Sequence, residues 1–80
     1  MKTPRYVSGK DVIKALKAFG YQPVRQNGSH ITVTSTIKGE HHLAIPNHNP
    51  IKTGTLNAIV SRVAEHFQLT KDEVMRSLFG

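Results

Sequence analysis

The sequence predicts an α+β fold in the order α-β-β-β-α, followed by a short helix at its C-terminal end. Two stretches, residues 8–20 and 54–67, carry apolar side chains at the three- and four-residue intervals of an amphipathic helix. Between them apolar and polar residues alternate, and glycines interrupt the alternation where turns are expected. Three short strands cannot bury both faces of a sheet, so helices should cover one face and leave an open, polar face.

The first helix is expected to begin at Ser8, with Asp11 as the partner in a capping box. Val7 and Val12 have the spacing of a hydrophobic staple, and Gly20 is placed to end the helix. The apolar stripe of this helix contains Val12, Ile13, Leu16 and Phe19.

The three strands are expected over residues 21–26, 29–36 and 40–46. Pro23 has no amide hydrogen to donate, so the first strand should lie at an edge of the sheet. The second helix, over residues 54–67, has the clearest amphipathic pattern in the chain. A capping box from Thr70 to Glu73 predicts the short last helix, over residues 70–79.

Asn27-Gly28 is a strong hairpin signal, because both central residues of a type I′ turn need positive φ. A two-residue loop there would place Arg25 opposite His30 on the open face. It would place Val24 opposite Ile31 on the covered face. The apolar alternation agrees with this register.

The second hairpin is expected to have a three-residue loop at 37–39. A two-residue loop would place Val33 opposite Ala44, whereas three residues keep Val33 and Leu43 on the same covered face. Thr34 then lies opposite His42 on the open face.

The same register decides which histidines can cooperate. His30 falls opposite Pro46, whereas His42 lies about 13 Å away along the open face, too far for direct cooperation. His48 follows Pro46 by two residues, so it lies on the diagonal, about 7–8 Å from His30 by backbone.

The composition indicates one domain, over residues 1–80, with a negatively charged partner. Eleven Lys and Arg oppose five Asp and Glu, which gives a formal charge of +6 and favours nucleic acid or an acidic protein as the partner. The absence of cysteine excludes disulfides and thiolate chemistry. No segment resembles a signal peptide or a membrane span, so we expect a cytoplasmic protein without a membrane partner.

An exposed His30 beside Arg25 suits RNA cleavage without a metal. That reaction needs a base for the 2′-OH proton, an acid for the leaving 5′-oxygen and cations around the phosphate. The alternative is a histidine on a solvated sheet face, as most exposed histidines are. A metal site is disfavoured, because no histidine pair has helical metalloprotease spacing and His41 and His42 project to opposite faces of a regular strand.

Basic residues suggest where RNA would lie. Three lysines share one side of the first helix and could follow a phosphate backbone, although a solvated helix surface has the same pattern. We expect His48 and Arg25 to support His30. The expected RNA contacts are Lys10, Lys14, Lys17, Arg25, Gly28, Ser29 and Thr32.

The chain also resembles HicA-type toxins, the small ribonucleases of bacterial toxin–antitoxin pairs. The resemblance covers residues 8–67 and rests on Phe19-Gly20-Tyr21, Gly28-Ser29-His30, Ile45-Pro46-Asn47-His48, and Thr53-Gly54-Thr55-Leu56 followed by Ile59. It implies a double-stranded-RNA-binding-like fold, an mRNA-cleaving endoribonuclease with His30 as the catalytic residue, and neutralisation by a HicB-type antitoxin. The last helix and the pair His41-His42 depart from the family pattern.

Two other functions remain open from the residues. One is a non-catalytic RNA-binding module, and the other is a small basic adaptor that binds an acidic protein. No cofactor is expected for the enzyme.

Overall fold

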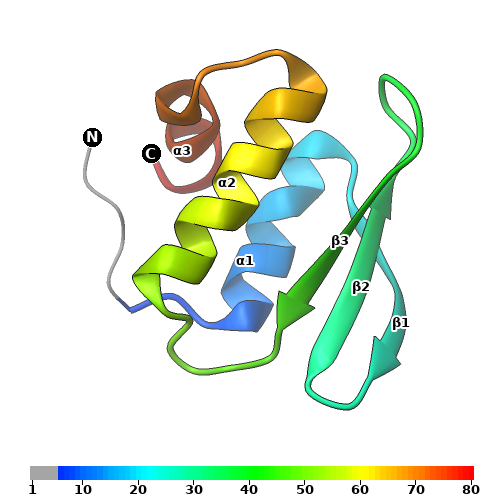
Figure 1. Cartoon of the computed structure of the whole chain (residues 1–80), viewed down its shortest axis with the longest axis vertical. Coiled ribbons are helices and arrows are strands. Elements are labelled where there is room, and N and C mark those ends of the chain that lie inside the picture. Colours follow the sequence, from blue (N-terminus) through cyan, green and yellow to red (C-terminus); the bar gives the residue numbers. More distant parts are fainter. Residues whose placement is uncertain (1–5) are drawn as a thin grey trace.

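The computed structural model describes residues 6–80 and contains the expected helices and strands in the expected order. They are α1 (Gly9–Leu16), a 3₁₀ turn η1 (Lys17–Phe19), β1 (Gln22–Asn27), β2 (His30–Ser35), β3 (His41–Pro46), α2 (Thr53–Phe67) and α3 (Lys71–Phe79). The strands form one antiparallel sheet in the order β1-β2-β3. α1 and α2 lie on one face of the sheet, and α3 packs against both helices on the side away from it (Figure 1). The predicted α+β class with an added C-terminal helix is confirmed.

The core lies between the covered face of the sheet and the helices. The predicted apolar residues of α2 are all buried: Leu56, Ile59, Val60, Val63, Ala64 and Phe67. Val33, Leu43 and Ile45 supply the buried residues of the sheet. Tyr21 and Ser35 are also fully buried. Ser35 follows Val33 by two residues and so lies on the covered face, whereas the alternation did not predict the burial of Tyr21.

Both predicted capping boxes are present. The Ser8 hydroxyl accepts from the Asp11 amide at 3.1 Å, and the Asp11 carboxylate accepts from the Ser8 amide at 3.1 Å. Thr70 and Glu73 form the same reciprocal pair at the start of α3. Gly20 ends the first helical segment with φ 84°, a left-handed conformation that favours glycine.

The predicted loop of the first hairpin is wrong by one residue, so the pairing of the strands is shifted by two. The loop is Gly28-Ser29, so Asn27 pairs with His30 and Arg25 pairs with Thr32. Gly28 has φ 63°, and Ser29 is not among the positive-φ residues of the described chain. Positive φ at the first central position alone is the type II′ pattern, which leaves Asn27 free to extend the strand.

A bulge changes the register again further along β1. The pairing slips between Pro23 and Arg25, so Pro23 lies opposite Val33 and Val24 has no partner. Val24 is therefore 61% exposed, not on the covered face as predicted. A bulge of this kind inserts one extra residue, and an alternating pattern does not reveal it.

The second hairpin has the predicted register. Val33 pairs with Leu43, Thr34 with His42, and His30 with Pro46. Its loop contains two left-handed residues, Lys38 at φ 56° and Gly39 at φ 97°. No helix within residues 6–80 is long and apolar enough to cross a membrane.

Candidate active site

His30 and His48 line the same hollow at one end of the sheet. The hollow has a volume of about 420 Å³, and its lining residues are His30, Ala44, Pro46, His48, Ile51, Lys52 and Thr55. We call it the His30 hollow. Both histidines are exposed, so a ligand in the hollow can reach their rings.

His30 is positioned by the hairpin turn and by the end of β3. It is the first residue of β2, directly after the Gly28-Ser29 loop. The amide of Asn47 donates to the carbonyl of Ser29 at 2.6 Å, which fixes the turn against the residue after β3. The ladder partner of His30 on that side is Pro46.

His48 is held through its backbone by the start of α1. The amide of Gly9 donates to the carbonyl of His48 at 2.9 Å. Gly9 is buried, and a Cβ on it would overlap the carbonyl oxygen of Pro46. The absence of a side chain at this position therefore lets α1 approach the loop that carries His48.

Lys52 and Thr55 belong to the hollow, and sequence reasoning missed both. Lys52 is the N-cap of α2, whose first turn has no side-chain cap and no acidic residue. The exposed ammonium group of Lys52 and the free amides of the first turn both favour a negatively charged ligand. Loop residues follow no period, so only the lysine next to the predicted helix start could have suggested this contribution.

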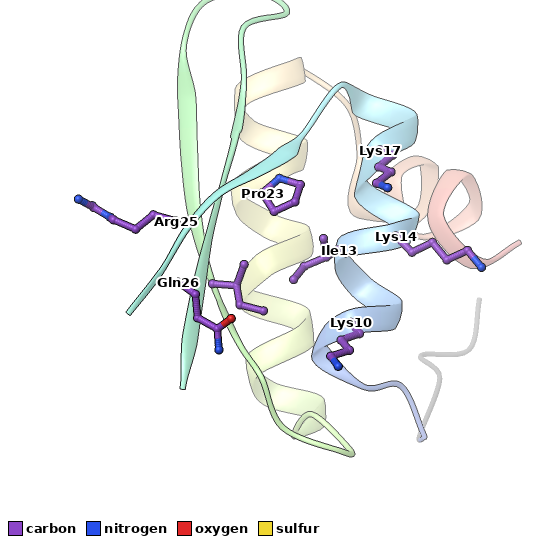
Figure 2. A pocket seen from close by; sticks show the side chains of 8 residues that line it. Lys10, Ile13, Lys14, Lys17, Pro23, Arg25 and Gln26 are labelled. Carbon is purple, nitrogen blue, oxygen red and sulfur yellow. The ribbon is translucent and has the colours of Figure 1, made fainter. Parts of the chain in front are cut away.

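Arg25 lies on the open face, but it is not the direct neighbour of His30. Its partner across the ladder is Thr32, so Arg25 is diagonal to His30. Figure 2 shows its side chain directed away from the helices. Arg25 is therefore open to a ligand on this face, beside His30 rather than directly opposite it.

His42 also lies on the open face, but its ring is committed to local partners. Its Nε2 lies 2.7 Å from the Glu40 carboxylate, and its Nδ1 lies 2.7 Å from the Thr34 hydroxyl. His42 pairs with Thr34, four residues along β2 from His30. It is therefore a structural residue outside the His30 hollow.

His41 projects to the covered face, opposite to His42, as the strand period predicts. The Tyr21 hydroxyl and the Nδ1 of His41 are hydrogen-bonded at 2.6 Å, and burial raises the pKa of Tyr21 to about 12. The ring of His41 stacks on that of His66, with centroids 4.3 Å apart and an interplanar angle of 6°. Burial lowers the pKa of His41, and the positive charge that His66 and Arg62 can carry lowers it further.

His66 connects this cluster to the second hairpin. Its Nε2–H donates to the carbonyl of Ile37 at 3.0 Å. The cluster of Tyr21, His41 and His66 thus links β3, α2 and the hairpin loop, and it serves stability. Within residues 6–80, no three His, Cys, Asp or Glu side chains are grouped so that they could hold a metal ion.

Lys10 and Lys14 of α1 and Lys17, which directly follows it in η1, are exposed and border a second depression, which shares no residue with the His30 hollow. It lies between α1 and β1 and has a volume of about 510 Å³. Its lining residues are Lys10, Ile13, Lys14, Lys17, Pro23, Arg25, Gln26 and Ile31 (Figure 2). We call it the α1–β1 groove.

A comparison with family models identifies the chain. Residues 9–73 match the model described as the HicA toxin of bacterial toxin–antitoxin systems. The match extends from α1 into the start of α3, and so contains the whole sheet and the His30 hollow. No curated protein and no solved structure matches the chain. Because the match covers most of the 80 residues, the chain belongs to the HicA toxin family.

Proposed function

We propose that this toxin is a metal-independent endoribonuclease that cleaves mRNA, with His30 as a general acid or base. The observation that carries the proposal is the His30 hollow, where two exposed histidines and a lysine meet. Histidine is the side chain best suited to move protons near neutral pH, and a pair can supply both a base and an acid.

The chemistry assigns a role to each part of the hollow. Attack by the 2′-oxygen forms a bond to phosphorus, and the bond from phosphorus to the 5′-oxygen breaks. One histidine takes the 2′-OH proton, while the other gives a proton to the leaving 5′-oxygen. Lys52 supplies positive charge to the phosphate, where negative charge develops. The products are a 2′,3′-cyclic phosphate and a 5′-hydroxyl.

Neighbouring groups would hold the RNA on either side of the cleaved bond. Arg25, Gly28, Ser29 and Thr32 lie on the open face or in the turn beside His30. Lys10, Lys14 and Lys17 continue the positive charge along α1 and would bind phosphates further along the strand. Phosphate contacts of this kind position RNA without reading its sequence.

The proposed partner is a HicB-type antitoxin, and the proposed location is the cytoplasm, where mRNA is available. The HicA family pairs a toxin with an antitoxin. An inhibitor that covers His30 and Arg25 would stop cleavage directly, because RNA could no longer enter the His30 hollow.

The test is to compare His30→Ala with His42→Ala. Both histidines are exposed on the same face, but His42 lies outside the hollow and is bound to Glu40 and Thr34. We expect the His30 variant to lose at least about a hundredfold in the rate of RNA cleavage, the usual scale for a general acid or base. We expect the His42 variant to remain within a few fold of wild type.

The assay uses purified protein, a labelled mRNA fragment and a circular dichroism check that each variant is folded. A His30→Ala protein that cleaves as fast as wild type contradicts the assignment. If the wild-type protein binds RNA in a salt-dependent way and never cleaves it, the protein is an RNA-binding module instead of an enzyme.

A further inference from the structure

The α1–β1 groove has an apolar floor and a cationic border. Ile13, Pro23 and Ile31 supply the apolar surface, and the lysines stand along the helix beside it (Figure 2). Next to the groove, Val24 in the bulge is exposed as well. Cleavage of RNA in the His30 hollow uses none of this apolar surface.

The positive charge beside the groove is not neutralised within the described chain. Lys10, Lys14 and Lys17 are four and three residues apart, so they lie on the same side of α1 and span about 10 Å along its axis. Asp11 is the one acidic residue of α1, and it is occupied in the capping box. Across residues 6–80, the only ion pair joins Glu40 and His42, outside the groove.

The edge of the sheet beside the groove is unsuited to adding another strand. Pro23 has no amide hydrogen, and the bulge at Val24 interrupts the regular spacing of β1. A partner is therefore recognised through side chains. An amphipathic helix lying in a groove is the form of recognition that uses them in this way.

The lining also distinguishes a protein from a nucleic acid. No aromatic residue lines the groove, so a base has nothing to stack on there. A phosphate backbone can use the lysines, but it gains nothing from Ile13, Pro23 and Ile31. Apolar side chains flanked by carboxylates match both the floor and the border.

We propose that the α1–β1 groove binds an acidic amphipathic helix of the antitoxin, with apolar side chains on the floor and carboxylates at Lys10, Lys14 and Lys17. This proposal rests on the toxin–antitoxin pairing of the family. The same lysines are proposed phosphate contacts, so the bound helix would also exclude RNA from α1. The antitoxin would then weaken substrate binding at a place separate from the His30 hollow.

The probe is a fluorescent 15-residue helical peptide, with leucines along one side and glutamates flanking them at intervals of four and three residues. Its control is a peptide of the same composition, reordered so that no apolar side forms. Binding is measured by fluorescence anisotropy at low salt, and the site is mapped by changes in the amide NMR spectrum. We expect the amphipathic peptide to shift the amides of Ile13, Gln26 and Ile31, and the control peptide to bind at least tenfold more weakly.

Two substitutions on β1 separate the groove from its surroundings. Gln26 lines the groove, whereas Gln22 pairs with Thr34 on the open face, and both are exposed. Gln26→Trp should fill the groove and weaken peptide binding at least tenfold, while Gln22→Trp should leave it unchanged. Replacing the three lysines with Gln should also weaken binding about tenfold and remove most of its salt dependence.

Each other outcome contradicts the proposal. Equal binding of both peptides would show attraction by charge alone, and shifts confined to the open face would place the peptide elsewhere. Absence of peptide binding at low salt would also overturn the proposal. So would a 12-nucleotide RNA that shifts the amides of Ile13 and Ile31 and no longer binds to the Gln26→Trp variant. The peptide test does not depend on catalysis: His30→Ala should bind the peptide as wild type does, even if the wild-type protein cleaves no RNA.

Discussion

Substitution of Gly9 by alanine tests the contact that holds α1 against the loop after β3. A Cβ at Gly9 would overlap the carbonyl oxygen of Pro46 and would stand 3.0 Å from the Cα of Asn47. Both are backbone atoms, so no side chain can move aside. The amide of Asn47 is also bonded to Ser29, and that of Gly9 to His48, so relief of the overlap must disturb one of these contacts.

The expected cost follows from this geometry. Overpacking a tight site typically costs 1–3 kcal/mol, and backbone on both sides places Gly9→Ala at about 2 kcal/mol. For a domain of this size, that corresponds to a fall in the melting temperature of roughly 8–16 °C. Well below the transition, RNA cleavage should also fall, because the Gly9 amide holds the His48 segment of the His30 hollow.

Gly54→Ala is the matched control. Gly54 lies in the first turn of α2, where a Cβ would meet no atom within 4 Å and φ is not positive. Alanine is the better helix former by up to about 1 kcal/mol, so this variant should melt at the same temperature or higher. Thermal unfolding followed by circular dichroism measures both variants. If Gly9→Ala melts within about 2 °C of wild type, Gly9 does not pack as closely against the backbone of Pro46 and Asn47 as the structure indicates.

Three further predictions concern pH, a buried hydroxyl and metals. The pKa of His41 is lowered in the folded state, so the unfolded chain takes up the proton first as the pH falls. The free energy of unfolding should therefore be constant above about pH 7 and decrease as the pH drops through 6.5. Urea titrations at several pH values measure this. A flat profile between pH 7 and pH 5 would contradict this. Ser35→Ala removes the donor to the Phe19 carbonyl and the acceptor for the Ile37 amide. The free energy of unfolding in urea should fall by about 1–3 kcal/mol, because Ser35 is fully buried. A loss below about 0.5 kcal/mol would mean that the carbonyl and the amide find other partners. RNA cleavage should persist in excess EDTA; its loss on chelation and recovery with a divalent ion would overturn the proposed mechanism.

Periodic features of the sequence predicted most of the fold. The pattern of α2 was unambiguous, because a single helical face contains all of its large apolar residues. The second hairpin was similarly constrained, since a two-residue loop would put Val33 and Leu43 on opposite faces. The first hairpin was not, because Asn27-Gly28 and Gly28-Ser29 both make two-residue loops. Moving the loop by one residue shifts the pairing by two and leaves Arg25 and Gln26 on the same faces, so the alternation could not distinguish the two loops.

The candidate site was predictable where it depends on strands and unpredictable where it depends on loops. Strand register places His30 opposite Pro46, and from there His48 is within reach. Lys52 reaches the hollow through a loop whose path is set by tertiary contacts, such as the bond from the Ile51 amide to the Val7 carbonyl. No local rule encodes that bond.

The topology explains why the exposed His30 and His48 and the half-buried His41 and His66 lie at opposite ends of the sheet. β2 begins where β3 ends, and the loop before α2 returns to the start of α1, so His30 and His48 meet where four chain segments converge. The opposite end of the same two strands is closed by the 37–39 loop, where His66 bonds to Ile37 and stacks on His41. Protonation of His41 therefore acts on the end closed by this loop, whereas proton transfer to RNA would take place at the other end. The acid sensitivity of folding and the pH dependence of cleavage should accordingly respond to different substitutions, the first to changes at His41 and the second to changes at His30.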